Sequence, residues 1–274
     1  MSFYPFSYFP ELASEHGATI DRLMIIVCVF MTLIFLGWLA FFIYTLLRFR
    51  GGKNPSAQPE GIRGRWVYGL AVGILVVELY IHFGLGGGVG ASQLSEINPT
   101  EETVQVRIVA QQFAWNIHYP GADGIFGVTA PEFFNDQSNP VGIDPDDEHG
   151  KDDIVTFKQL FLPVNKAVRI ELSSKDVIHS FFLPEFRIKQ DVIPGMEIPV
   201  TFVPTMTTDE FREIKGDEAR DFEIACAQLC GVTHYTMKGM VRILDQEGFD
   251  AWLVEKAPKE GAGEGDDFWA DDSL

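Results

Sequence analysis

The most informative stretch of this chain is residues 222–237, which read Phe222-Glu-Ile-Ala-Cys226-Ala-Gln-Leu-Cys230-Gly-Val-Thr-His234-Tyr-Thr-Met237. An apolar run typical of a β-strand leads here into a loop with two thiols, an imidazole and a thioether. The glycine after the second thiol lets the chain turn tightly. A second imidazole stands upstream in Asp176-Val-Ile-His179-Ser. If both segments end at one edge of a sheet, these side chains meet and predict a metal site.

The ligand types allow three interpretations. Thiolate and thioether sulfurs combined with imidazole favour copper, and a pair of thiolates can bridge two metal ions. Two cysteines with two histidines also satisfy a tetrahedral zinc site, in which Met237 has no role. The third interpretation is a disulfide between Cys226 and Cys230, because thiols on an oxidising side of a membrane readily pair.

Short runs of alternating apolar and polar residues, rich in β-branched side chains, surround this motif. Turns with Pro, Gly and Asp separate the runs, which predicts a β-sandwich or barrel of Greek-key type. A closing helix is expected over residues 246–256. The expected strands include residues 104–110, 155–162, 167–172, 198–203, 222–225 and 239–244.

Residues 121–153 fit no strand pattern and are rich in Asn, Pro and acidic side chains. A loop of this length is uncommon in a compact domain unless it is functional or packs on a neighbour. Its acidic cluster could hold a hard cation or meet a basic partner, and a solvated loop is the simplest interpretation. The cluster comprises Asp144, Asp146, Asp147, Glu148, Asp152 and Asp153.

Two long apolar stretches precede the β pattern. Residues 23–47 contain no charged residue, and residues 66–89 are interrupted only by Glu78 and His82. At ~1.5 Å per residue, each stretch can span a hydrocarbon core of ~30 Å. Both exceed the roughly 7–15 apolar residues of a signal peptide. The sequence therefore predicts a hairpin of two transmembrane helices, in which Cys28 is a packing residue.

These patterns divide the chain into four expected parts. They are an external N-terminal segment over residues 1–22, a transmembrane hairpin over residues 23–90, a β domain over residues 91–257 and a flexible acidic tail over residues 258–274.

Charge is unevenly distributed along the chain. Residues 1–90 carry six Lys or Arg against five Asp or Glu, a net charge of +1, so residues 91–274 carry −19 and the whole chain −18. Most early positive charges lie between the two apolar stretches, which places that loop in the cytoplasm and both termini on the outer face. We expect a bacterial cytoplasmic membrane protein whose β domain faces the periplasm. An acidic surface attracts basic partners and argues against nucleic-acid binding.

The metal motif closely resembles the copper loop of cytochrome c oxidase subunit II. The shared pattern is Cys-x3-Cys-x3-His-x2-Met, preceded by Asp-Val-x-His-Ser. Residues 182–195 resemble the strand and turn after the first histidine of that family. With the two-helix anchor and the external β domain, the resemblance covers about residues 20–250. It implies a cupredoxin fold with a mixed-valence dinuclear copper centre, CuA.

The resemblance also implies a role for each ligand. The two cysteines would bridge both ions; the first histidine and the methionine would complete one ion, and the second histidine and a backbone carbonyl the other. Electrons would come from a cytochrome c and pass to the haem of subunit I, where oxygen reduction and proton pumping occur, with subunit III as a further partner. The implied ligands are His179, Cys226, the carbonyl of Gln228, Cys230, His234 and Met237.

The chain departs from the family pattern at two places. The family has Glu at position 228, where it helps to hold Mg²⁺ against subunit I, and the neutral amide of Gln228 argues against that site. The family's entry tryptophan for electrons is replaced by Phe113, while Trp115 matches a later aromatic and could equally be a core residue. We expect electron entry at Phe113 and Trp115, and Asp176 is a candidate docking residue for a partner.

Glu78 is the thirteenth of the 24 residues in the second apolar stretch, and His82 lies one helical turn further on. An unpaired charge at the bilayer centre costs ~2.5–3.5 kcal/mol or more, so such residues usually face protein and have a partner. Two interpretations remain. Both residues contribute to a polar or proton-conducting contact with subunit I, or they form a structural hydrogen-bonded pair.

Other redox and copper proteins share parts of this pattern. The chain has no Cys-x-x-Cys-His motif, so it carries no c-type haem and its electron donor is a separate protein. A copper-bearing nitric oxide reductase subunit remains an alternative. Nitrous oxide reductase lacks the two-helix anchor, and structural subunits of quinol oxidases have lost the copper ligands that this chain retains. A copper-delivery protein would need neither the hairpin nor the full ligand set.

Overall fold

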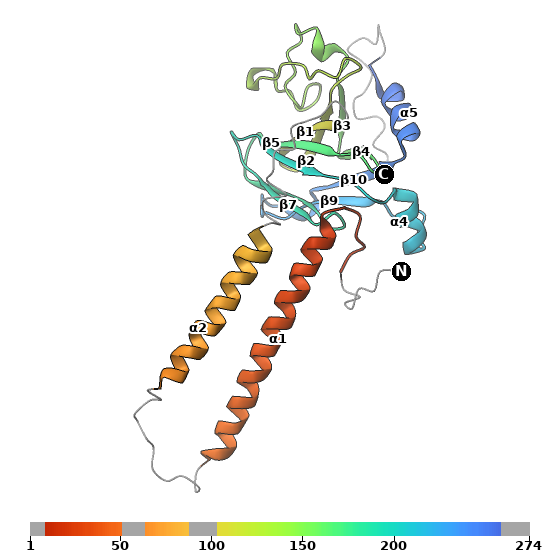
Figure 1. The fold of residues 1–274 in the computed structure, drawn as a ribbon. Coiled ribbons are helices and arrows are strands. Elements are labelled where there is room, and N and C mark those ends of the chain that lie inside the picture. Colours follow the sequence, from red (N-terminus) through yellow and green to blue (C-terminus); the bar gives the residue numbers. More distant parts are fainter. Residues whose placement is uncertain (1–8, 51–63, 88–102, 259–274) are drawn as a thin grey trace. The chain divides into compact units, whose positions relative to one another are not determined.

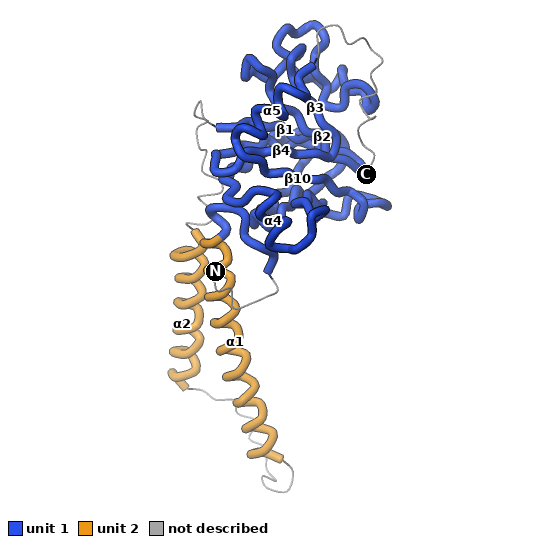
Figure 2. Tube along the Cα trace, turned by 90° about the vertical axis from the view of Figure 1, so that its right-hand side faces the viewer, with its two compact units in different colours: residues 1–17, 93–274 blue, residues 18–92 orange. Residues whose placement is uncertain are grey.

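The computed structural model describes residues 9–50, 64–87 and 103–258, and the chain divides into two compact units. One unit comprises residues 18–92, and the other combines residues 1–17 with residues 93–274 (Figure 2). The expected cytoplasmic charges Lys53 and Arg63 and nearly all of the acidic tail lie outside the described residues.

The smaller unit contains two helices (Figure 1). Helix α1 spans Gly17–Arg48 and exceeds the expected apolar stretch at both ends. Helix α2 spans Arg65–Leu79 and continues into a π-helix, η1, at Tyr80–Leu85. Both are long and apolar enough to cross a membrane, and neither apolar window is buried by the chain itself.

The larger unit is a sandwich of two five-stranded sheets, as the cupredoxin resemblance implied. The first sheet has the order β3-β2-β1-β5-β8, and the second has the order β4-β10-β9-β6-β7. Their strands are β1 (Val104–Gln111), β2 (Ala114–Tyr119), β3 (Ile154–Phe157), β4 (Gln159–Pro163), β5 (Val168–Ser174), β6 (His179–Leu183), β7 (Ile188–Val192), β8 (Ile198–Phe202), β9 (Phe222–Cys226) and β10 (Lys238–Leu244).

Alternating side chains from both sheets form one buried core. In β5, for example, the apolar positions are buried and the polar positions between them are half-exposed, as period-two alternation requires. Helix α5 (Gln246–Lys256) closes the core because the ring of Trp252 stacks on Phe161 at 4.5 Å. Helix α4 (Thr208–Lys215) begins with a capping box at Thr207 and Glu210.

Residues 121–153 contain the short 3₁₀ turns η2 (Pro131–Phe133) and η3 (His149–Lys151) and no strand. Their anchor is Asp153, which is buried and accepts hydrogen bonds from His118 and from the backbone N–H groups of Gly121 and Gly127. His118 is on β2, where all six residues are buried. The loop therefore packs on its own domain, over the face of β2 that alternation would otherwise leave exposed.

Candidate metal centre

Two free thiols lie at the centre of the site. Cys226 ends strand β9, and Cys230 follows in the loop, where it is 4% exposed. Their Sγ atoms are 3.9 Å apart, far beyond the ~2.05 Å of a disulfide bond. Among the residues that the structure describes, His179 and these two cysteines form the one group of three or more His, Cys, Asp or Glu residues whose ligand atoms lie within 4.8 Å of one another.

His179 reaches the site from a neighbouring strand. It begins β6, which pairs antiparallel with β9, so that Phe181 lies opposite Cys226. The imidazole is fully buried, with Nδ1 at 4.0 Å from Cys226 Sγ and Nε2 at 2.8 Å from Asp176 Oδ1. If Nε2–H donates to this carboxylate, the lone pair of Nδ1 is directed at the sulfur, as in metal sites where a carboxylate orients the histidine.

His234 and Met237 complete the ligand set on the side of Cys230. His234 begins the 3₁₀ turn η4 (His234–Thr236), and its Nδ1 lies 3.5 Å from Cys230 Sγ. The Sδ atom of Met237 lies 3.7 Å from the same sulfur, and Met237 is 1% exposed. Each thiol therefore has its own imidazole, and one thiol also has a thioether. The backbone carbonyl of Gln228 lies 3.2 Å from Cys226 Sγ.

Backbone contacts anchor the loop that carries these ligands. The N–H of Cys226 donates to Met237 O at 3.2 Å, and Ala227 N–H donates to Ser180 O at 3.0 Å. The Gln112 side chain donates from Nε2 to Cys230 O, and its backbone N–H donates to Asp176 Oδ2 at 2.7 Å. Gln112 thus links the cysteine loop to the carboxylate that orients His179. The resemblance had not marked this residue, because a hydrogen bond between positions 112 and 230 leaves no spacing signal in the sequence.

The ionisation of the two thiols differs. Burial disfavours the charged form of Cys226, but hydrogen bonds with His179 and with the backbone of Ser180 and Gln228 lower its pKa to about 6. Burial and the neighbouring charge of Cys226 raise the pKa of Cys230 to about 11. The pKa of Asp176 is lowered, since its hydrogen bonds with His179 and Gln112 outweigh burial. Cys226 therefore loses its proton more readily than Cys230. A bound cation would also favour loss of the proton of Cys230, because cysteine binds metal ions as a thiolate.

The donor set fits a soft metal ion. Its sulfur and imidazole atoms lie close together in a largely buried site. The carboxylate of Asp176, which is not itself a ligand, contacts the imidazole of His179. A zinc site would require four of these groups and would leave the buried thioether at 3.7 Å from a thiol without a role.

The aromatic residues expected at electron entry lie beside this centre. Phe113 is half-buried, and its ring packs so closely on Gly231 that a Cβ there would lie 2.9 Å from Phe113 Cζ. Trp115 is fully buried and lies edge-on to His179, with ring centroids 6.2 Å apart. Glu78 and His82 belong to the helical unit, on α2 and η1.

Comparisons with known proteins agree with these features. Residues 104–244, just over half of the chain, match the family model described as cytochrome C oxidase subunit II, periplasmic domain. An alternative cytochrome c oxidase subunit 2 from Bradyrhizobium diazoefficiens is 31% identical over 226 residues, which cover 81% of this chain and 75% of that protein. A cytochrome c oxidase subunit 2 from Synechocystis is 23% identical over 276 residues, covering 91% and 76%.

A solved structure, the periplasmic domain of cytochrome oxidase subunit II from Bradyrhizobium japonicum, matches with a TM-score of 0.38 and 25% identity. The match covers 58% of this chain and 95% of that one.

Fold and site together define a cupredoxin-type protein with two candidate membrane helices and a cluster of soft metal ligands. More particularly, the chain belongs to the cytochrome c oxidase subunit II family. It is the electron-accepting subunit of a haem–copper oxidase complex, associated with a membrane and carrying an extracytoplasmic domain.

Proposed function

We propose that this chain accepts electrons from a cytochrome c at a dinuclear copper centre, CuA, and passes them to the haem of subunit I of a proton-pumping oxidase. The observation that carries the proposal is the pairing of ligands around two thiols. Cys226 has His179 on its side, while Cys230 has His234 and Met237 on the other. Two sulfurs with separate sets of further donors suit two metal ions better than one.

The residues of the chain have distinct tasks in this proposal. Cys226, Cys230, His179, His234, Met237 and the backbone carbonyl of Gln228 would hold the two ions, with donors on both sides of the thiol pair. Such a centre supplies one-electron chemistry, because the added charge is shared by two metals and two sulfurs. Asp176 Oδ1 lies 2.8 Å from His179 Nε2 and accepts its proton in a hydrogen bond, so that Nδ1 stays available as a ligand.

Burial suits rapid electron transfer at this site. His179 and Met237 are almost fully inaccessible, and the loop is tied to the sandwich by Gln112 and by the backbone of β6. Ligands held by a rigid scaffold move little when the charge changes, which keeps the cost of reorganisation low. In this proposal electrons enter through Phe113 and Trp115, which lie beside Gly231 and His179, and Asp176, whose side chain is 31% exposed, meets the donor.

The arrangement in the cell follows from the same family. Both termini and the β domain face the periplasm of a bacterial cytoplasmic membrane, and subunits I and III are partners within the membrane. Gln228 is exposed, and its neutral amide is a poor replacement for a carboxylate, so we expect no strong Mg²⁺ site at this position.

Copper content with electron paramagnetic resonance spectroscopy of the full-length chain tests the proposal. The expected result is two coppers per chain and a hyperfine pattern from one unpaired electron shared by two copper nuclei. Met237→Leu should alter that pattern, because it removes the buried thioether at 3.7 Å from Cys230 Sγ. Met240→Leu is the matched control, since Met240 is half-buried against the core on β10.

A single copper, zinc, or a metal-free disulfide would contradict the electron-transfer proposal. The alternative in a haem–copper nitric oxide reductase shares the same centre, so purification of the intact complex and assay of oxygen against nitric oxide as acceptor separates the two.

A further inference from the structure

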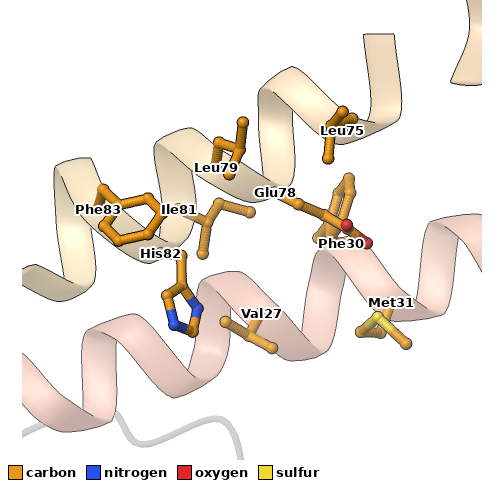
Figure 3. A pocket seen from close by; sticks show the side chains of 9 residues that line it. All are labelled: Val27, Phe30, Met31, Leu75, Glu78, Leu79, Ile81, His82 and Phe83. Atoms are coloured by element: carbon orange, nitrogen blue, oxygen red, sulfur yellow. The ribbon is translucent and has the colours of Figure 1, made fainter. Parts of the chain in front are cut away.

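A pocket of about 370 Å³ lies within the helical unit (Figure 3). Its walls are apolar side chains of both helices, except for the carboxyl of Glu78 and the imidazole of His82. In Figure 3 both side chains extend from the second helix towards the first, with Glu78 near Phe30 and Met31 and His82 near Val27. The α1 residues that line this pocket, Val27, Phe30 and Met31, contribute no titratable group.

The carboxyl of Glu78 and the imidazole of His82 lie within a candidate membrane span, where a charged side chain is energetically unfavourable. Glu78 lies thirteen residues after Arg65, about 20 Å along the helix at ~1.5 Å per residue, within a span of 21 residues. Ionisable side chains inside a membrane are expensive and usually serve proton or ion pathways. A carboxyl and an imidazole that hold one proton between them carry no net charge, whichever of the two binds it. The pair therefore avoids the cost of a net charge in hydrocarbon.

The backbone changes at the same place. The α-helix gives way to the π-helix Tyr80–Leu85 directly after Glu78 and Leu79, so His82 lies inside the π-helical segment. π-Helical turns are rare and frequently occur at functional sites, because the widened turn redirects side chains. Here the change of helix type lies between the two ionisable residues, and both still line one pocket.

We propose that Glu78 and His82 form a proton-exchange site within the membrane-spanning part of the oxidase. Among the described residues neither side chain hydrogen-bonds to another side chain, and the pocket has room for several waters at about 30 Å³ each. The carboxylic acid of Glu78 gives its proton to this water, which protonates the imidazole of His82 in turn. The products are a carboxylate and an imidazolium, and the reverse transfer restores the starting pair, so charge and protons balance.

The assembled oxidase in lipid vesicles tests this site through two measurements. One is the number of protons released per electron, and the other is the infrared difference spectrum between oxidised and reduced enzyme. Glu78→Gln should lose the carbonyl-stretch band of a protonated carboxyl and lower the protons released per electron. His82→Asn should lower the proton count as well, whereas Glu78→Asp, which keeps a carboxyl, should restore both signals in part.

Tyr80→Phe is the matched control, because Tyr80 lies at the same depth and does not line the pocket. Its proton count and infrared spectrum should equal those of the unmodified enzyme. An unchanged proton count in Glu78→Gln, or an equal loss in all variants including Tyr80→Phe, would overturn the proton-exchange site. The paramagnetic signal of the copper centre is read separately, so failure here leaves the proposed electron-transfer function standing.

Discussion

At the scale of the residue, Gly231 shows how closely the metal loop is fitted to the rest of the domain. Its φ angle of 147° is one that side chains rarely adopt, and a Cβ there would lie 2.8 Å from Gln112 Nε2 and 2.9 Å from Phe113. Gly231→Ala should lower the free energy of unfolding by about 1–3 kcal/mol or more through backbone strain and displacement of these neighbours. Denaturant unfolding of the full-length chain measures the change.

Gly195→Ala separates strain from contact. Gly195 also has a positive φ, 77°, but nothing lies within 4 Å of its added Cβ. It should therefore lower stability without altering the copper spectrum, whereas Gly231→Ala should change both. Equal effects of the two substitutions would show that the close packing of Gln112 and Phe113 on Gly231 does not contribute to stability.

The residues of the site were predictable to the extent that the sequence places them close together. Cys226, Cys230, His234 and Met237 share one loop, and their spacing carried the prediction. His179 lies 47 positions before Cys226, so its place in the site was a hypothesis about two segments that end at one sheet edge, and the pairing of β6 with β9 brings it to the sulfurs. The contacts of Gln112 were not predictable, since they join segments more than a hundred positions apart and depend on the finished sandwich.

At the scale of the element, the strands that followed the alternating pattern were predicted, a strand after His179 was implied by the resemblance over residues 182–195, and β2 was missed. The expected strand over residues 155–162 is two strands, β3 and β4, because Lys158 has a φ of 57° and moves the chain from one sheet to the other. Strand β2 was missed because the loop over residues 121–153 buries its outer face and removes the alternation. The π-helix of the second span has no sequence signal in an apolar pattern.

Asp153 should determine whether the long loop stays folded on the domain. Its carboxylate accepts from His118 and two backbone N–H groups in a fully buried place, and an amide cannot accept from all three. Asp153→Asn should cost about 1.5–3 kcal/mol, the range for a hydrogen bond to a charged group, and should make residues 121–153 sensitive to protease.

Asp152→Asn provides the control for this loop. Asp152 is the half-exposed neighbour of Asp153 and accepts one backbone hydrogen bond, from Asp123. It should lower stability much less and leave the cleavage rate of the loop nearly unchanged. Identical proteolysis of the two variants would contradict an anchoring role for Asp153.

The exposed pair Asp123 and His149 should make the same loop sensitive to pH. Their hydrogen bond raises the pKa of His149 above 6.5 and lowers the pKa of Asp123 below 3.8. The contribution from His149 is complete below pH 6.5 and is lost as the pH rises through its raised pKa. The contribution from Asp123 is present above pH 3.8 and is lost as the pH falls through its lowered pKa.

The loop should therefore be held most firmly between about pH 4 and pH 6.5. Titration of His149 by nuclear magnetic resonance checks the cause: Asp123→Asn should return its pKa towards 6.5, and Asp146→Asn, on the exposed surface of the loop, should have little effect. An unaltered His149 pKa in Asp123→Asn would rule out this pairing.

At the scale of the whole molecule, the β unit is built from two separate parts of the sequence. Residues that precede the first helix join the sandwich formed by residues far beyond the second. The backbone of Ala13 donates to Glu185 O and accepts from Thr205 N–H, and Glu15 N–H donates to Val203 O. Ala13 is fully buried and Ser14 nearly so. The β unit is therefore discontinuous in sequence, and a fragment that starts after the hairpin lacks part of it.

This discontinuity predicts the behaviour of a soluble fragment over residues 93–258. A separate peptide of residues 9–17 should bind to it and raise its melting temperature, because three backbone hydrogen bonds and the buried Ala13 are restored. A gain of 1 kcal/mol raises the melting temperature of a domain this size by about 2–4 °C, so a shift of several degrees is expected at saturating peptide. The same peptide with Ala13→Asp should not bind, since it would bury a charge at a fully enclosed position. An equal melting temperature with and without the unmodified peptide would show instead that the N-terminal segment adds nothing to the fold, and that its contacts depend on the helix to which it is joined.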